Sequence, residues 1–373
     1  MLYSISRLLT PHWGPFRLLS SHALLLAGGT FCAALLVVLA LPHLWNRLPR
    51  DRGKVVGNEK MGESAKGKPT GAGFFVALLA LPVILLFAPL APWDAMTVLA
   101  IYAAMVFGYM DDAAAVPWGE LKKGLLDLAV SLAAAYFIFM GHSDPVEGCS
   151  TRQMLVWLPF FTGSVQGGLY ISPWIYVPVA AFVLWFTMNA TNCSDGVDGL
   201  AGSLTVITLV ILAVILYVVV GYRPVAHYFL IPVYAEAARW AIVVMIAAGA
   251  FGGYLWFNAE PSRILMGDAG SRFLGMLVAA ATLMTGNPLL VLALSPIVLV
   301  NGGGGMGKLV LLRTAKRLGF EIGEDAAIRK VRFPLHDHCK KKLGWSNAQV
   351  LMRFILLQLI VMPILLIALL KIR

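Results

Sequence analysis

Long apolar windows recur along almost the whole 373-residue chain and leave few folds open to it. A helix needs about 20 mainly apolar residues to cross the roughly 30 Å hydrocarbon core of a bilayer. About ten windows of this kind are found at 22–45, 73–92, 94–110, 124–141, 173–191, 200–221, 238–257, 271–286, 288–308 and 350–371. Inside hydrocarbon the backbone must satisfy its own hydrogen bonds, which favours helices. The windows therefore predict an all-α polytopic membrane protein with about ten transmembrane helices.

Composition supports this class. The chain is 59% hydrophobic and 13% charged, with a mean hydropathy of +0.80. This charge content is too low to cover the surface of a soluble protein of this length. The sequence shows no internal repeat, and we expect residues 1–373 to form a single integral membrane domain.

The distribution of basic residues predicts the orientation. Most of the 29 lysines and arginines follow the first, third, seventh and ninth windows or lead into the tenth. By the positive-inside rule these segments are cytoplasmic, and both termini are extracytoplasmic. The predicted cytoplasmic loops lie near 46–72, 111–123, 192–199, 258–270 and 309–349.

Acidic residues gather at the same predicted face, at the ends of separate windows. They lie in the segments GYMDDAAAV (Asp111, Asp112), NCSDGVDGL (Asp195, Asp198) and MGDAGS (Asp268). Two carboxylates about 5 Å apart repel by roughly 3 kcal/mol at an effective dielectric constant of about 20, so converging acids require a cation. Mg²⁺ suits them, because it takes oxygen ligands and bridges carboxylates to phosphates. Helix capping by Asp remains the alternative for any single acid.

Glycines and basic residues complete a predicted anion site at this cytoplasmic-facing cleft. The DG pairs at 195–196 and 198–199 and the GDAGS segment place backbone N–H groups at helix N-termini, which bind phosphate. Lys66 and Thr70, in EKMGESAKGKPTGAG, either clamp a diphosphate or attract anionic headgroups. His336 and His338 flank Asp337 and precede three lysines. This pattern favours an anion-binding segment over ordinary solvent-exposed loop histidines. These residues predict a metal-dependent membrane enzyme acting on phosphate esters or anhydrides.

The motifs KGKPTGAG, GYMDD, NATNCSDGVDGLAG, HYFLIP, GGYLWFNAEP, MGDAGS and PLHDHCKKKLGW occur in this order. Together, over about residues 20–371, the chain resembles the polyprenyl-phosphate N-acetylhexosamine-1-phosphate transferases. HYFLIP and LWFNAEP are similar to the branch that transfers phospho-MurNAc-pentapeptide. The resemblance implies transfer from UDP-MurNAc-pentapeptide to undecaprenyl phosphate, giving lipid I and UMP in peptidoglycan synthesis. It also implies Mg²⁺, a bacterial inner membrane with a cytoplasmic active site and, by analogy, a homodimer; we expect no nucleic-acid partner.

The resemblance also implies roles for individual residues. Asp111 is the expected general base for the lipid phosphate, with Asp112 supporting it; Asp268 and Asp195 are the expected metal ligands, and His336 belongs to the catalytic set. The expected substrate contacts are Lys66, Thr70, Asn189, Asn192, Asp195, Gly196, Asp198 and His338. Both direct in-line attack and a phospho-aspartyl intermediate stay open, and we favour direct attack.

The chain departs from the family pattern around the nucleoside and diphosphate contacts and keeps the acidic set. The departures are PTGAG for PTMGG, Ala115 for a lysine, HDH for three histidines, Cys339-Lys340 for Phe-Glu, Leu265 for an aromatic residue, and the glycine-rich NGGGGMG at 301–307.

Three other functions are compatible with parts of the sequence. A sister enzyme would use another UDP-N-acetylhexosamine, and an inactive scaffold would share the motifs. An ion-coupled transporter would place acids near mid-span in two matching halves, whereas here they lie at the window ends.

Overall fold

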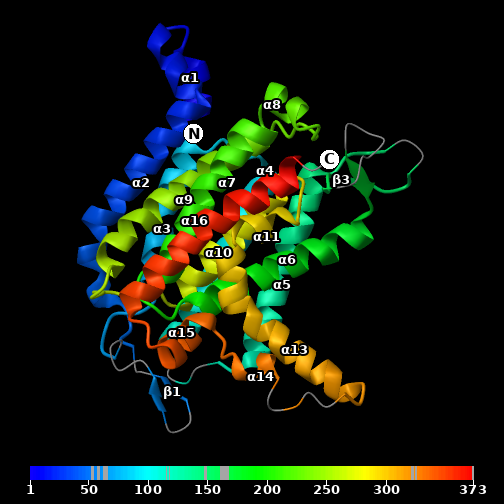
Figure 1. Cartoon of the computed structure of the whole chain (residues 1–373). Helices are drawn as coiled ribbons and strands as arrows, with labels where there is room; N and C mark the ends of the chain where they lie inside the picture. The colour runs from blue at the N-terminus through cyan, green and yellow to red at the C-terminus, as the bar shows by residue number, and fades with distance from the viewer. Residues whose placement is uncertain are drawn as a thin grey trace.

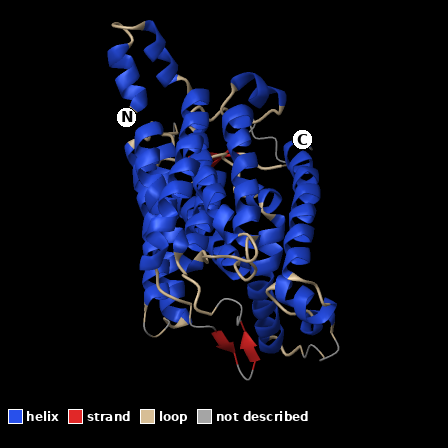
Figure 2. Cartoon of the chain, turned by 90° about the vertical axis from the view of Figure 1, so that its left-hand side faces the viewer, coloured by secondary structure: helices blue, strands red, loops and turns tan. Residues whose placement is uncertain are grey.

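The computed structural model describes residues 1–51, 54–56, 59–61, 66–114, 116, 118–146, 149–159, 168–320, 323 and 326–371. Over these residues the chain is mostly helical, as predicted, and its short strands lie near the ends of the helix bundle (Figure 2).

The helices are α1 (Leu2–Leu9), α2 (His22–Leu44), α3 (Ala72–Phe87), α4 (Pro92–Ala113), α5 (Glu120–His142), α6 (Pro173–Ser194), α7 (Leu200–Val214), α8 (Arg223–Tyr228), α9 (Ala237–Asn258), α10 (Gly267–Leu283), α11 (Leu290–Leu294), α12 (Pro296–Val298), α13 (Gly304–Arg317), α14 (Ala327–Lys330), α15 (Leu335–Leu343) and α16 (Asn347–Lys371). Two 3₁₀ segments are η1 (Gly14–Ser20) and η2 (Trp45–Arg47), and two π-helical segments are η3 (Ile215–Val220) and η4 (Leu299–Gly303). Strand β1 (Lys54–Val56) pairs antiparallel with β2 (Glu59–Met61), Lys54 opposite Met61, and β3 (Met154–Val156) with β4 (Leu169–Ile171), Met154 opposite Ile171.

The described residues include 7 helical segments long and apolar enough to cross a membrane. These are His22–Arg47, Pro92–Ala113, Glu120–His142, Pro173–Ser194, Leu200–Val220, Ala237–Asn258 and Asn347–Leu370. Helix α3 is apolar but shorter, with 16 residues, and α10 covers most of the window at 271–286. A multi-pass membrane protein is therefore confirmed, while the count of ten spans stays a prediction.

The window 288–308 is not one continuous helix. It divides into α11, α12, η4 and the first turns of α13. Pro296 has no backbone N–H to continue the α11 ladder, and a π-helical turn follows it. At Gly302 a Cβ atom would lie 1.9 Å from the carbonyl oxygen of Ala190, so only glycine allows η4 to pack this closely on α6. The apolar window does not reveal this break, because its charged residue, Lys308, stands at its very end.

Helix α10 lies at the centre of the packing, and every residue from Ala269 to Leu283 is buried. Small residues let its neighbours approach, as is usual between membrane helices. A Cβ on Gly73 of α3 would lie 2.1 Å from Cα of Gly270, and a Cβ on Gly108 of α4 would lie 2.6 Å from the carbonyl oxygen of Asp268. The α3 and α4 backbones thus touch the first turns of α10 directly.

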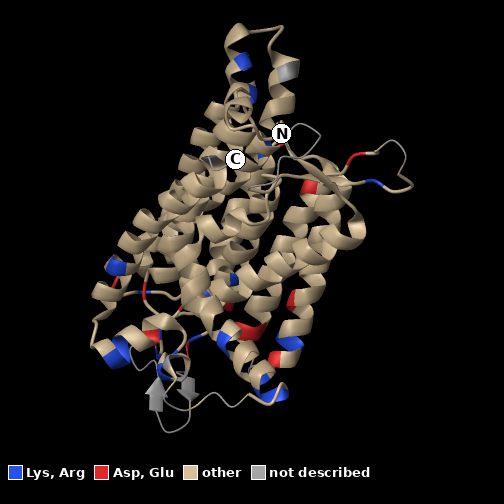
Figure 3. Cartoon of the chain, turned by 45° about the vertical axis from the view of Figure 1, so that its right-hand side comes forward, with Lys and Arg blue, Asp and Glu red and all other residues tan. Residues whose placement is uncertain are grey.

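The two ends of the bundle differ in what they carry. Both termini lie at the end that carries α8 and β3, while β1, α13, α14 and α15 lie at the opposite end (Figure 1). Most of the lysines and arginines gather near that opposite end (Figure 3). The two termini thus share one end of the bundle, and their extracytoplasmic location stays a prediction.

Candidate functional site

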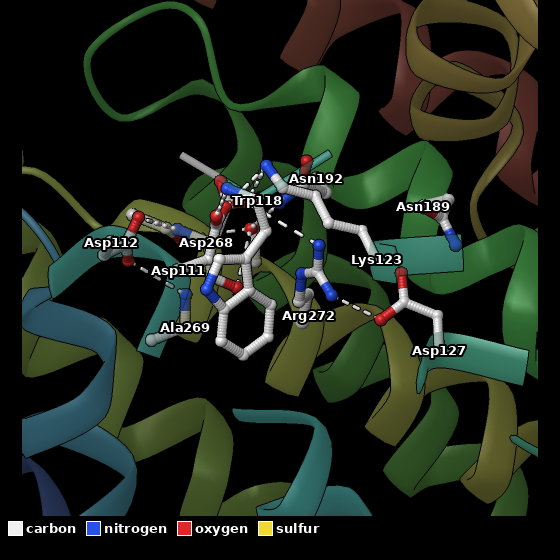
Figure 4. Close-up of polar contacts among 12 residues, drawn as sticks. Asp111, Asp112, Trp118, Lys123, Asp127, Asn189, Asn192, Asp268, Ala269 and Arg272 are labelled. Carbon is white, nitrogen blue, oxygen red and sulfur yellow. Dashed lines mark hydrogen bonds and ion pairs between the residues drawn. The ribbon is translucent and has the colours of Figure 1, made fainter. Parts of the chain in front are cut away.

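The last turn of α4 and the first turn of α10 bring Asp111, Asp112 and Asp268 together (Figure 4). Asp112 Oδ1 accepts a hydrogen bond from the N–H of Asp268 at 3.2 Å, and its Oδ2 accepts one from the N–H of Ala269 at 3.3 Å. Both oxygens of Asp112 therefore cap α10. The capping alternative thus describes Asp112 well, and its carboxylate joins α4 to the turn that carries Asp268.

Lys123, in the first turn of α5, places its ammonium group between the two other acids. Its Nζ lies 2.5 Å from Asp111 Oδ2 and 3.7 Å from Asp268 Oδ2. The N–H of Trp118 donates to Asp111 Oδ1 at 2.7 Å. The Asp111 side chain is 6% exposed, whereas those of Asp268 and Lys123 are each 19% exposed. The ammonium group of Lys123 therefore supplies part of the positive charge that converging acids need. Sequence reasoning had used this lysine only to predict the orientation of the chain.

A second basic group, Arg272, follows Asp268 by one helical turn. Its Nη2 lies 3.7 Å from Asp268 Oδ2, and its Nη1 contacts Asp127 Oδ1 on α5. Asp127 and Arg272 are both buried. Sequence reasoning missed this pair as a part of the site. The i,i+4 spacing of Asp268 and Arg272 was a usable signal for the contact within α10, but nothing local links α10 to α5.

A second polar group ties three predicted cytoplasmic loops together. Asp198 Oδ2 accepts from Lys68 Nζ at 3.5 Å and from the N–H of Ser262 at 3.2 Å, and Lys68 Nζ also donates to Ser262 Oγ at 2.9 Å. Asn258 Oδ1 accepts from the N–H of Gly199 at 2.8 Å, and its Nδ2 donates to the carbonyl of Ile264 at 2.8 Å. The loop carrying Asp198 is therefore held from two sides.

The basic loop contributes Lys68 to this group, a residue that the sequence did not single out. Lys66 is exposed, and Thr70 N–H donates to the carbonyl of Pro49 at 2.9 Å. The loop runs beside the MGD segment, because Leu265 N–H donates to the carbonyl of Pro69 at 2.8 Å. Thus the KGKPTGAG motif and the MGDAGS motif are neighbours in space. Ala115, the departure from the expected lysine, lies outside the described residues.

The predicted residues at the end of α6 differ in their contacts with α10 and with the cluster of acids. Asn192 Nδ2 donates to Ser271 Oγ on α10 at 3.0 Å, which joins α6 to the turn after Asp268. Asn189 Nδ2 donates to the carbonyl of Trp185 at 2.9 Å, and its side chain lies near Asp127 (Figure 4). Asp195 is half-buried directly after α6. Among the described residues, no three His, Cys, Asp or Glu side chains form a group that could hold a metal ion, so the Asp195–Asp268 pair stays a prediction.

His336, on α15, packs on the loop that follows α6. A Cβ on Gly196 would lie 2.2 Å from His336 Nε2. Asn301 Oδ1 accepts from the His336 backbone N–H at 2.8 Å and lies 3.2 Å from its Nδ1. A backbone N–H only donates, so this Asn301 atom is the oxygen, and Nδ1 carries the ring hydrogen. His336 Nε2 is therefore an acceptor that faces Gly196.

Burial lowers the pKa of His336 to about 4; the positive charge of Lys340 lowers it as well, while Asp337 raises it. The ring is therefore neutral at pH 7. His338 has a local role in the structure, since its Nδ1 accepts from the N–H of Arg332 at 3.2 Å. The two predicted histidines thus lie in different environments: His336 lies against Gly196 of the DGVDG segment, and His338 accepts from the backbone of Arg332.

Comparison with known proteins gives a consistent result over most of the chain. Residues 95–286, which include Asp111, Asp112 and Asp268, match the family described as "Glycosyl transferase family 4". The phospho-N-acetylmuramoyl-pentapeptide-transferase of Treponema pallidum (strain Nichols) is 41% identical over 360 residues, covering 96% of this chain and 93% of that protein. Proteins of the same name from Brachyspira hyodysenteriae and Chlorobium phaeovibrioides are 28% identical over 402 residues and 32% identical over 302 residues. These cover 100% and 78% of this chain, and 100% and 77% of the relatives.

Proposed function

Because this chain belongs to glycosyl transferase family 4, with phospho-N-acetylmuramoyl-pentapeptide transferases among its relatives, we propose that it catalyses the reaction named for them. It transfers phospho-MurNAc-pentapeptide from UDP-MurNAc-pentapeptide to undecaprenyl phosphate and releases lipid I and UMP. The observation that carries this function is 41% identity across 96% of the chain, reinforced by acids from α4 and α10 that meet at one place.

We place the site on the cytoplasmic side of a bacterial plasma membrane, with ten spans and both termini outside. The support is the gathering of lysines and arginines near the end opposite to the termini (Figure 3). On this topology the soluble nucleotide substrate approaches from the cytosol, and the lipid acceptor approaches within the membrane. A homodimer is part of the proposal by analogy only.

Asp111 is the proposed general base. It takes a proton from the acceptor's phosphate, whose oxygen then attacks the β-phosphorus of the nucleotide substrate. The new phosphoanhydride bond forms as the bond to the bridging oxygen of UMP breaks, and UMP leaves with that oxygen. Lys123, 2.5 Å from Asp111 Oδ2, stabilises the carboxylate form of this base. Its positive charge would also stabilise the negative charge of the reacting phosphates. We favour direct displacement; both oxygens of Asp112 accept hydrogen bonds from the N-terminus of α10, which disfavours Asp112 as the nucleophile of a covalent route.

The charge of the cluster is compatible with Mg²⁺. The cluster combines four carboxylates with two basic groups: Asp111, Asp112, Asp127, Asp268, Lys123 and Arg272. If all are ionised, two negative charges remain, which one divalent cation balances. Magnesium is commonly held by one or two carboxylates, with waters and substrate phosphates as its other ligands. Asp268, which is partly exposed, and Asp195 are the proposed ligands, and the metal would neutralise charge on the departing diphosphate oxygen.

The remaining predicted residues are proposed to bind the nucleotide. This set comprises Asn189, Asn192, Gly196 and Asp198 at the end of α6 and in the loop after it, Lys66 and Thr70 in the loop before α3, and His338 on α15. Lys68 joins this set, because it already pairs with Asp198. His336 offers a neutral acceptor nitrogen beside Gly196, where a donor group on the substrate or on a bound water would bind.

A transfer assay with purified protein in detergent tests the function. Radiolabelled UDP-MurNAc-pentapeptide and undecaprenyl phosphate are expected to yield labelled lipid and UMP. EDTA should stop the reaction, and added Mg²⁺ should restore it. The matched reaction contains UDP-GlcNAc in place of the muramoyl nucleotide. Product only from UDP-GlcNAc would instead identify the sister activity, and no product from either substrate would contradict both.

A further inference from the structure

The ion pair between Asp127 and Arg272 is buried beside the proposed catalytic acids. Asp127 is 0% exposed and Arg272 is 4% exposed. Asp127 is held by Arg272, and Arg272 faces Asp127 and Asp268. Their contact joins α5 to α10, and both residues lie close to the pair formed by Asp268 and Lys123 (Figure 4).

Stability alone gives a weak reason for this pair. Removing two charges from water costs about as much as their attraction returns, and apolar residues of similar size are often as stabilising. Arg272 Nε is also buried without a hydrogen-bond partner in the part of the chain that the structure describes. The pair is therefore better explained by what it does to its neighbours.

The guanidinium group points in two directions at once. Nη1 contacts Asp127, and Nη2 lies 3.7 Å from Asp268 Oδ2. Lys123 Nζ lies at the same distance, 3.7 Å, from that oxygen. Lys123 and Asp127 are four residues apart on α5 and therefore lie on one face of it. Helix α5 thus supplies one cation to Asp268 itself and holds a second cation in place on α10.

We propose that Asp127 is a positioning residue that acts through Arg272, fixing the guanidinium group so that the Asp268 carboxylate keeps one orientation toward Asp111. The inference rests on the proposed function and adds residues to it. Arg272 directs a separate nitrogen at each carboxylate, with a spacing that the planar guanidinium group fixes, so lysine, with a single nitrogen, should not replace it. A displacement of about 1 Å at a reacting group can cost about 100-fold in rate.

Two double variants separate positioning from simple structural support. Asp127→Leu with Arg272→Met removes the whole pair without leaving a buried charge. It should fold with an unchanged or higher melting temperature, while kcat falls about 100-fold and KM stays within about twofold. Asp127→Arg with Arg272→Asp keeps an ion pair but puts a carboxylate beside Asp268. Its kcat should also fall. If the pair were purely structural, the exchange would instead restore wild-type kcat.

Asp94 and His142 provide the matched control. His142 Nε2 contacts Asp94 Oδ1 at 2.9 Å, at the ends of α4 and α5 that lie away from the acids, with Asp94 buried and the His142 side chain 14% exposed. Asp94→Asn should lower the melting temperature and leave kcat unchanged. Wild-type kcat in the apolar double variant, or full recovery in the exchanged one, would overturn the positioning role. Absence of turnover in the wild-type protein would instead reject the proposed function itself.

Discussion

Gly73→Ala tests whether the direct contact between α3 and α10 sets the geometry of the acids. A Cβ at this position would lie 2.1 Å from Cα of Gly270 and 2.5 Å from its nitrogen. Carbon atoms normally pack at about 3.5 Å or more, so the two helices must separate by roughly 1.4 Å. Both obstructing atoms belong to a helix backbone, and no side-chain rotation relieves the clash.

The separation should reduce both stability and activity. Overpacking costs typically 1–3 kcal/mol, which exceeds the gain of at most about 1 kcal/mol from replacing a helical glycine by alanine. When α10 is the helix that shifts, the hydrogen bonds of 3.2 and 3.3 Å by which Asp112, on α4, holds its N-terminus would lengthen. We therefore expect a melting temperature several degrees lower and a fall in kcat of about 100-fold.

Thermal unfolding in detergent and initial rates of UMP release measure the two effects. Gly124→Ala on α5 is the matched control, because a Cβ there would meet no atom within 4 Å. It should leave the rate unchanged and the melting temperature equal or slightly higher. A Gly73→Ala protein with wild-type melting temperature and kcat would refute the argument that backbone contact fixes the site.

Three further predictions concern single residues of the site. Asp268→Asn should abolish turnover without changing the melting temperature by more than a few degrees, and persistent Mg²⁺-dependent UMP release would remove Asp268 from the metal site. Because the pKa of His336 is lowered to about 4, its contribution to stability is complete above pH 6.5 and is lost as the pH falls toward 4; the loss is about 3 kcal/mol. Denaturation curves at several pH values should show that the free energy of unfolding falls less with decreasing pH in His336→Gln than in the wild-type protein. The same pH dependence in both proteins would argue against a neutral buried ring. Asn301→Leu should remove the acceptor for Nδ1–H, and ¹⁵N NMR of the histidine rings should then show a changed tautomer for His336, together with a lower kcat; an unchanged ring spectrum would contradict the role of Asn301.

The helices and the polarity of the two bundle ends follow from local features of the sequence. Apolar windows of membrane length become helices because the hydrocarbon leaves the backbone no other partner. The acids at the window ends met in space for a related reason: Asp111 and Asp268 lie at helix termini that face the same end. The apolar windows and the acids at their ends each depend on residues that are close in the sequence, so a single sequence is enough to predict them.

The partners of those acids could not be predicted in the same way. Lys123 and Asp127 are ordinary members of a helical sequence until α5 packs beside α10, and that contact joins residues about 145 positions apart. Asp112 has the same residue type as Asp111 but a different role, because only its side chain reaches the N–H groups of α10. The break at Pro296 was also hidden, since proline is tolerated in membrane helices when neighbours satisfy the backbone.

Both chain termini lie at the end of the bundle that carries α8 and β3, opposite to β1, α13, α14 and α15 (Figure 1). On the proposed topology, a reporter fused to either terminus lies in one and the same aqueous compartment, on the side of the membrane opposite to the proposed nucleotide site. Fluorescent proteins or affinity tags at these positions would leave the catalytic face unobstructed, and accessibility of both tags to an impermeant reagent in intact cells would establish the sidedness of the enzyme.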